Sequence, residues 1–233
     1  MNGARPIERE THWSWLGRIP YEDAFRLQVA LRDALARGEG PERLLLLEHP
    51  HVYTLGRNAS EEDLLLGEAE RSELGIEVAA TDRGGQVTYH GPGQLVGYPI
   101  LDLNPDRRDL RRYVRDLQEV LVRTLADFGI SAEGGAGESI GVWVPDAERG
   151  RKIASIGIHL SRWRTTHGFA LNVATDLGLF RGIVACGLPA VDMTSIARER
   201  GAAPALEEVA DRLRPHFAAV FSRRLVAAEV PAT

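Results

Sequence analysis

Residues 140–173 read IGVWVPDAERGRKIASIGIHLSRWRTTHGFALNV and contain three apolar runs in succession. The runs Ile140–Val144, Lys152–Leu160 and Gly168–Val173 are separated by proline, glycine and charged residues. Short apolar runs bounded by such residues are typical of β-strands, so this stretch predicts three consecutive strands. Strands that follow one another without an intervening helix favour antiparallel pairing, because parallel neighbours need a long crossover.

Helices and further strands precede and follow this stretch. A helix is predicted between Pro20 and Gly38, with apolar residues at helical spacing: Ala24, Leu27, Leu31 and Leu35. Asp109 can cap a second helix that ends before Gly129, with the apolar stripe Leu110, Val114, Leu117, Leu121, Leu125 and Phe128. Further predicted strands are Leu44–Leu47, Val52–Leu55 and Val96–Leu101.

The tail from Pro204 to Leu225 is amphipathic and contains Pro215, which predicts two short helices or one kinked helix. Strands are clustered along the chain rather than alternating strictly with helices. This order favours an α+β fold with a largely antiparallel sheet over a doubly wound fold.

The composition excludes several classes of protein. The 233 residues are 44% hydrophobic, which fits one domain over residues 1–233 or two closely packed lobes. No stretch approaches the roughly 20 apolar residues of a membrane span, and residues 1–10 are polar, unlike a secretory signal. A net charge of −5 argues against a nucleic-acid partner. Cys186 is the single cysteine, which excludes an internal disulfide; we therefore expect a cytoplasmic protein.

Lysine is almost absent from the chain. Of the 28 basic residues, 27 are arginine and the other is Lys152. Arginine replaces lysine on solvated surfaces, but it cannot act where an amine must lose its proton. Lys152 is therefore a candidate for chemistry, and the alternative is one surface lysine left by chance.

The segment from Arg83 to Gln94, RGGQVTYHGPGQ, combines four glycines with polar side chains and predicts a binding loop. It matches neither a phosphate-binding Walker loop nor the dinucleotide fingerprint. The alternative is a wide turn between strands in which the glycines serve only the geometry.

Cys186 precedes Gly187 in a turn-rich segment, where a lone cysteine is either a small buried hydrophobe or a nucleophile. An ordinary thiol has a pKa of about 8.5, and one close ammonium could lower this pKa by about two units, roughly 2.7 kcal/mol. Cys186 could instead pair with His90 or His167 as in cysteine hydrolases. His49, His51 and His90 could be drawn as a metal trio, but the chain has no recognised zinc signature, and we predict no metal site.

These residues together resemble the octanoyltransferases of lipoate biosynthesis, also called lipoyl(octanoyl) transferases, from about Leu44 to Ile196. The matching motifs are Glu48–Pro50, Thr54–Arg57, Arg83–Gln94, Tyr98–Ile100, Lys152–Gly157, His167–Asn172, Cys186–Leu188 and Thr194–Ser195. One departure is Ala185, where the family usually has proline before the nucleophilic cysteine. The substitution affects the rigidity of this loop more than the thiol.

The resemblance implies a biotin/lipoate protein ligase-like fold, with a larger and a smaller sheet flanked by helices. It makes Cys186 the acyl-thioester nucleophile and Lys152 the residue that lowers its pKa. It also implies a set of residues that line the acyl site: Arg83, Gly84, Gly85, Gln86, Val87, Thr88, Tyr89, His90, Ser155, Ile156, Gly157, Gly168, Phe169 and Ala170. No metal, ATP or organic cofactor is required, because a thioester is already activated.

The resemblance further implies a monomeric enzyme with two protein partners. Neither a membrane nor a nucleic acid is expected as a partner. The donor would be octanoyl-acyl carrier protein, and the acceptors would be lipoyl domains of 2-oxoacid dehydrogenase E2 subunits and the glycine cleavage H protein. Such carriers tend to be acidic, and we expect Arg149 and Arg151 to help dock one of them. A second basic cluster is interpreted as a solvated face: Arg107, Arg108, Arg111, Arg112 and Arg115.

Three alternatives remain open from the sequence. An ATP-dependent lipoate or biotin ligase on the same fold would use the lysine without Cys186. A non-catalytic module would only bind acyl or lipoyl groups. A Cys–His hydrolase would depend on His90 or His167 and make Lys152 incidental.

Overall fold

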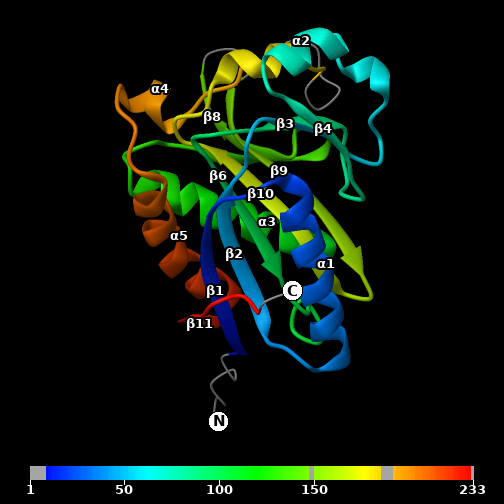
Figure 1. Ribbon diagram of the computed structural model, residues 1–233. Helices are drawn as coiled ribbons and strands as arrows, with labels where there is room; N and C mark the ends of the chain where they lie inside the picture. The colour runs from blue at the N-terminus through cyan, green and yellow to red at the C-terminus, as the bar shows by residue number, and fades with distance from the viewer. Residues whose placement is uncertain (1–8, 147–149, 185–190, 232–233) are drawn as a thin grey trace.

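The computed structural model describes residues 9–146, 150–184 and 191–231. It is built around an eight-stranded sheet, with helices packed against it (Figure 1). The strands, in their order across the sheet, are β11 (Arg223–Ala227), β1 (Arg9–Arg18), β2 (Glu42–Glu48), β6 (Gln94–Ile100), β10 (Arg164–Asn172), β9 (Arg151–Ser161), β8 (Gly141–Val144) and β7 (Glu133–Gly135). Neighbours pair antiparallel, except that β1 lies parallel to both β11 and β2.

A smaller three-stranded sheet has the order β4 (Glu77–Ala80), β3 (Val52–Leu55) and β5 (Val87–His90). Two short helical segments, η1 (Glu61–Asp63) and α2 (Glu68–Glu73), connect β3 to β4. A third, η3 (Leu177–Gly182), follows β10 in the sequence and contacts β5. Tyr53, Tyr89 and Phe180 form part of its buried apolar cluster.

Helices cover both faces of the large sheet. Leu44 and Leu46 pack in one cluster with α3 (Leu110–Ala126) and α5 (Leu206–Phe221). Leu45 and Leu47 pack on the opposite side with α1 (Tyr21–Arg37). Successive side chains of a strand point to opposite faces, so a run of four leucines fits a strand that is buried on both sides. The remaining helical segments are η2 (Gly137–Ser139) and α4 (Ile196–Arg200).

The predicted α+β class is confirmed, with a largely antiparallel large sheet, a small sheet and flanking helices. Asp109 caps α3 as expected, because its side chain accepts a hydrogen bond from the Arg112 N–H. The tail is one helix that continues through Pro215, and β11 follows it. The stretch predicted as a binding loop is partly strand, since β5 occupies residues 87–90 within it.

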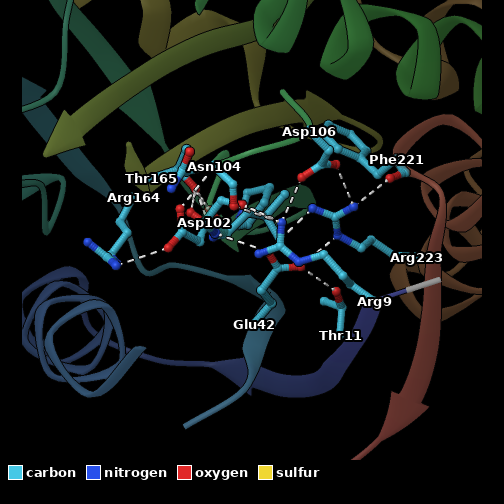
Figure 2. Close-up of polar contacts among 12 residues, drawn as sticks. Arg9, Thr11, Glu42, Asp102, Asn104, Asp106, Arg164, Thr165, Phe221 and Arg223 are labelled. Atoms are coloured by element: carbon cyan, nitrogen blue, oxygen red, sulfur yellow. Dashed lines mark hydrogen bonds and ion pairs between the residues drawn. The ribbon is translucent and has the colours of Figure 1, made fainter. Parts of the chain in front are cut away.

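A buried ion-pair cluster joins the parallel strands at one end of the large sheet (Figure 2). The Glu42 carboxylate accepts from Arg223 Nε and pairs with Arg9, at 2.6 Å in each case. It also accepts from the Thr11 hydroxyl and the Asp102 N–H. Asp106 also pairs with both arginines, so two carboxylates compensate two guanidiniums, and the contacts link β1, β2 and β11.

None of the helices in the part of the chain that the structure describes is both long and apolar enough to cross a bilayer.

Candidate active site

A cavity of about 500 Å³ brings together three motifs from distant parts of the sequence. Its lining includes nearly all the predicted acyl-site residues: 83–88, His90, 155–157 and 168–170. Lys152 lines the same cavity. The volume lies in the usual range for small-molecule sites in proteins, about 300–1,000 Å³.

Two of the motifs meet because β9 and β10 are paired. Gly157 lies opposite Gly168, Ile156 opposite Phe169, and Ser155 opposite Ala170. Gly168 has to be glycine, because a Cβ there would lie 2.3 Å from the Gly97 carbonyl oxygen on β6. The antiparallel register therefore places the two predicted stretches side by side in the cavity wall.

The turn at residues 83–86 forms a second wall of the cavity. Arg83 Nη2 donates to the carbonyl oxygen and hydroxyl of Thr54, at 2.6 and 2.8 Å, and Nε also donates to that hydroxyl. The Gly84 N–H donates to the Ile158 carbonyl oxygen at 2.8 Å, which ties the turn to β9. A Cβ at Gly56 would come within 2.3 Å of the Gly85 oxygen, so the close approach of β3 to this turn requires glycine.

Tyr89 is the exception among the predicted lining residues, because it does not line the cavity. Its ring packs against Tyr53 and Phe180, at centroid distances of 5.9 and 5.2 Å. Its hydroxyl lies 2.8 Å from His51 Nδ1. Side chains alternate along β5, so Tyr89 faces the small core while Thr88 and His90 face the other way.

Three buried histidines near the cavity are held neutral. Burial lowers the pKa of His49 to about 4. Burial also lowers the pKa of His167 to about 4, although the Asp82 carboxylate, 2.7 Å from Nε2, opposes this shift. Burial, with His49 and Arg83 nearby, holds the pKa of His90 well below its ordinary value. All three are therefore neutral imidazoles at pH 7.

Both ring nitrogens of His49 are already used within the protein. Nδ1 donates to the Ile19 carbonyl oxygen and Nε2 accepts from the Tyr98 hydroxyl, each at 2.8 Å. Across residues 9–146, 150–184 and 191–231, no three His, Cys, Asp or Glu side chains are grouped to hold a metal ion. His49 is thus a structural residue that does not itself line the cavity, and the metal trio of His49, His51 and His90 finds no support among these residues.

Lys152 is almost fully enclosed, with 1% of its surface exposed, so it is not a surface lysine. Its Nζ lies 5.3 Å from the centroid of the Trp143 ring. Its backbone pairs with the chain around Met193: the Lys152 N–H donates to Asp192 O, and Lys152 O accepts from the Thr194 N–H. Cys186 lies outside the described residues, as do Ala185, Gly187 and Leu188. The described chain before this gap ends at Val184, whose N–H donates to Asp63 O.

Sequence reasoning left several lining residues out of the predicted site: Tyr21, Asn58, Tyr98, Val114, Gly137, Ile140, Ile158 and His167. Tyr98 and His167 belong to motifs that carried the resemblance, so a signal for them was present. Tyr21 stacks on His90 at a centroid distance of 6.2 Å, a contact that only the packing of α1 creates.

The second basic cluster agrees in part with the sequence interpretation: Arg108, Arg111, Arg112 and Arg115 are exposed, whereas Arg107 is buried. Arg151 forms a two-pronged contact with Glu199, with both N–O distances 3.0 Å, and a further pair with Asp146. Arg149 lies outside the described residues. Arg107, predicted on a solvated face, is buried against Asp116 and the Phe221 ring, because its guanidinium fills space between α3 and α5.

Comparisons with known proteins agree with this arrangement. The family model for the lipoyl protein ligase A/B catalytic domain matches residues 20–218. An octanoyltransferase of Solibacter usitatus is 51% identical over 88% of this chain and 90% of its own length. An octanoyltransferase of Geobacter metallireducens is 43% identical over 90% of this chain and 93% of its own length. The solved bipartite lipoate protein ligase of Thermoplasma acidophilum shares the fold, with a TM-score of 0.74 at 18% identity over 94% of this chain and 87% of that one. The chain therefore belongs to the lipoyl protein ligase A/B catalytic domain family and, within it, to the octanoyltransferases, which are acyltransferases.

Proposed function

We propose that this chain transfers an octanoyl group from octanoyl-acyl carrier protein to a lysine of a lipoyl domain, through a thioester on Cys186. The observation that carries the proposal is the position of Lys152. The single lysine of the sequence is buried and lines a cavity formed by the family motifs. An amine in an enclosed site can change its protonation state, which an arginine guanidinium cannot do, so Lys152 can move a proton.

In the first half-reaction, the Cys186 thiolate attacks the carbonyl carbon of the donor thioester. A carbon–sulfur bond to Cys186 forms, the bond to the carrier sulfur breaks, and the carrier leaves as a thiol after taking up a proton. Lys152 as an ammonium favours the thiolate form of Cys186 and supplies that proton. One thioester replaces another, so this step is close to balanced in free energy.

In the second half-reaction, the amine of the acceptor lysine attacks the acyl-enzyme. An amide bond forms, the bond to Cys186 breaks, and neutral Lys152 accepts the proton that the amine loses. Amide formation makes the cycle favourable, and no ATP is needed because the thioester carries the activation.

The cavity is lined by both apolar and polar side chains, which suits an acyl chain with a polar carbonyl end. Val87, Ile156 and Phe169 supply apolar wall, while neutral His90 and His167 avoid a buried charge beside the chain. Each buried methylene contributes about 0.8 kcal/mol, so the depth of such a cavity can discriminate acyl length.

The lipoyl-domain acceptor is supported by two kinds of relative. The curated relatives carry the name octanoyltransferase, and the Thermoplasma ligase is described as part of a lipoylation system with its E2 lipoyl domain. The acceptors proposed for this chain are the lipoyl domains of 2-oxoacid dehydrogenase E2 subunits and the glycine cleavage H protein.

Intact-mass measurement after mixing with octanoyl-acyl carrier protein, without ATP, tests the proposal. Wild type should gain one octanoyl group, and Cys186→Ser should gain none. Lys152→Arg keeps the charge but cannot release a proton, so it should load partly and fail in transfer. Lys152→Met, which better fits the enclosed site, should lose both steps.

Each competing function predicts a different result. Absence of any added mass would support a binding module, and turnover that requires ATP would support a ligase. A hydrolase would lose acylation in His90→Ala or His167→Ala while Lys152→Met stays active.

A further inference from the structure

A hydrogen-bonded relay of three buried side chains, His90, Gln94 and Asn172, connects the cavity to the backbone beside Lys152. His90 Nδ1 lies 2.8 Å from Gln94 Oε1, and Gln94 Nε2 lies 2.9 Å from Asn172 Oδ1. Asn172 Nδ2 lies 3.0 Å from Thr194 O. Because the Thr194 N–H donates to Lys152 O, the relay ends on backbone that is hydrogen-bonded to β9 at Lys152. All three side chains are buried.

Two backbone carbonyls fix the direction of every bond in this relay. A carbonyl oxygen can only accept, so Asn172 must turn its NH₂ group to Thr194 O and its oxygen to Gln94. Gln94 then donates from Nε2 both to Asn172 and to the Tyr89 carbonyl oxygen, at 3.2 Å. Its remaining atom, Oε1, faces His90 and can only accept.

His90 is therefore the tautomer with its hydrogen on Nδ1, and its Nε2 carries a lone pair. This assignment follows from the acceptor character of fixed oxygens and needs no observed hydrogen. His90 also lines the cavity and stacks on Tyr21. In His49, by contrast, Nε2 already accepts from the Tyr98 hydroxyl.

We propose that Gln94 and Asn172 are positioning residues that hold His90 as a hydrogen-bond acceptor for the incoming lysine amine. This inference rests on the proposed function and assigns His90 to its second half-reaction. An acyl thioester offers only acceptor atoms, so a lone pair on Nε2 cannot bind it. The attacking amine offers N–H groups, and Nε2 can accept one of them in the cavity while the proton of the amine passes to Lys152.

The tautomer is measured directly on the full chain labelled with ¹⁵N-histidine at pH 7. In wild type, the ¹⁵N signals of His90 should show a protonated Nδ1 and an unprotonated Nε2, with His90→Gln identifying the signals. Gln94→Met has similar volume but no amide, so the Nε2–H tautomer should appear in this variant. Asn172→Ser removes the hydrogen bond between Gln94 and Asn172, one bond further from His90. Gln94 can still donate to Tyr89 O, so the change in the His90 tautomer should be smaller than in Gln94→Met.

The two half-reactions are then measured separately. Octanoyl loading on Cys186 should stay within about twofold of wild type in Gln94→Met, while transfer to a lipoyl domain should fall about tenfold, the size expected for one lost hydrogen bond. Thr124→Val is the matched control, because it removes one buried hydrogen bond of α3 and does not line the cavity. It should change neither step.

An Nε2–H tautomer in wild type would overturn the relay, and so would equal losses of loading and transfer in Gln94→Met with unchanged ¹⁵N signals. If wild type takes up no octanoyl group on Cys186, the proposed function and the role of His90 in transfer are contradicted. The tautomer assignment would then still be decided by the NMR measurement alone.

Discussion

Gly141 leaves room for Lys152. A Cβ built on Gly141 would lie 2.6 Å from Lys152 Cε and 3.3 Å from its Nζ. Gly141 also has a φ of +145°, a conformation that favours glycine. The missing side chain on β8 is therefore what allows the buried amine on β9 to occupy its position.

Gly141→Ala should displace Lys152 and lower octanoyl transfer by about 10²-fold, the effect expected when a reacting group moves by about 1 Å. Overpacking and backbone strain should also reduce the free energy of unfolding by about 1–3 kcal/mol. Transfer rates and urea unfolding measure the two effects. Gly40→Ala is the control, since its Cβ would meet only Ala34 Cβ, at 3.6 Å. Wild-type transfer in Gly141→Ala would contradict a role for this close approach.

Gly97→Ala should shift the acyl-length preference toward shorter chains. A Cβ at Gly97 would lie 2.1 Å from the Phe169 ring, which forms part of the cavity wall. The ring must move, and the adjacent cavity offers it space. Comparison of kcat/KM for C4, C6, C8 and C10 acyl donors measures the change, with about threefold to fourfold expected per excluded methylene. An unchanged length profile in a folded variant would show that Phe169 does not set the depth.

Acidification should destabilise the chain between pH 6.5 and 4. Burial holds the pKa values of His49 and His167 at about 4, whereas an unfolded histidine has a pKa of about 6.5. Within this window the unfolded chain binds more protons than the folded chain, so the free energy of unfolding falls as pH falls, by up to about 3 kcal/mol for each residue.

Urea unfolding at pH 7 and pH 5 tests this dependence. His49→Gln should reduce the difference between the two pH values, because residue 49 no longer takes up a proton on unfolding. His216→Gln, on the surface of α5, serves as the matched control. The same pH dependence in His49→Gln and wild type would count against a contribution from His49.

Removing one partner of the Glu42–Arg223 pair should destabilise the fold but leave the octanoyl-transfer rate unchanged. Glu42→Gln leaves the buried Arg223 without its main compensating charge, at a cost of about 3–5 kcal/mol. Neither residue lines the cavity, so the octanoyl-transfer rate of the folded variant should match wild type. Urea unfolding and transfer assays measure both, and the double variant Glu42→Leu/Arg223→Met should be less destabilised than Glu42→Gln.

Arg151→Gln should impair carrier-bound and small thioester donors by the same factor. The guanidinium of Arg151 is held by Glu199 and Asp146, so its loss disturbs the start of β9 rather than a docking surface. Parallel assays with octanoyl-acyl carrier protein and a small octanoyl thioester test this. A selective loss with the carrier would restore the docking role expected from the sequence.

Much of the local structure could be predicted from the sequence because its signals are local. Val52–Leu55 is a strand with the predicted bounds, and α1 ends before Gly38 as its spacing predicts. In contrast, β1 (RETHWSWLGR) has neither a continuous apolar run nor a sustained alternation, and β11 is short, so neither has a strong signal. These two strands pair with each other across nearly the whole chain length, a contact that no local pattern encodes.

The sequence by itself determined the motifs, the glycines and the single lysine that form much of the cavity wall, because these are readable as residue types at fixed spacing. Only the tertiary structure decided which way these groups face. Tyr89 points away from the cavity because successive side chains of β5 face opposite sides of the small sheet. The His90 tautomer depends on the carbonyl oxygens of Tyr89 and Thr194. Hydrogen-bond direction and burial depend on partners far apart in the chain, and folding alone brings those partners together.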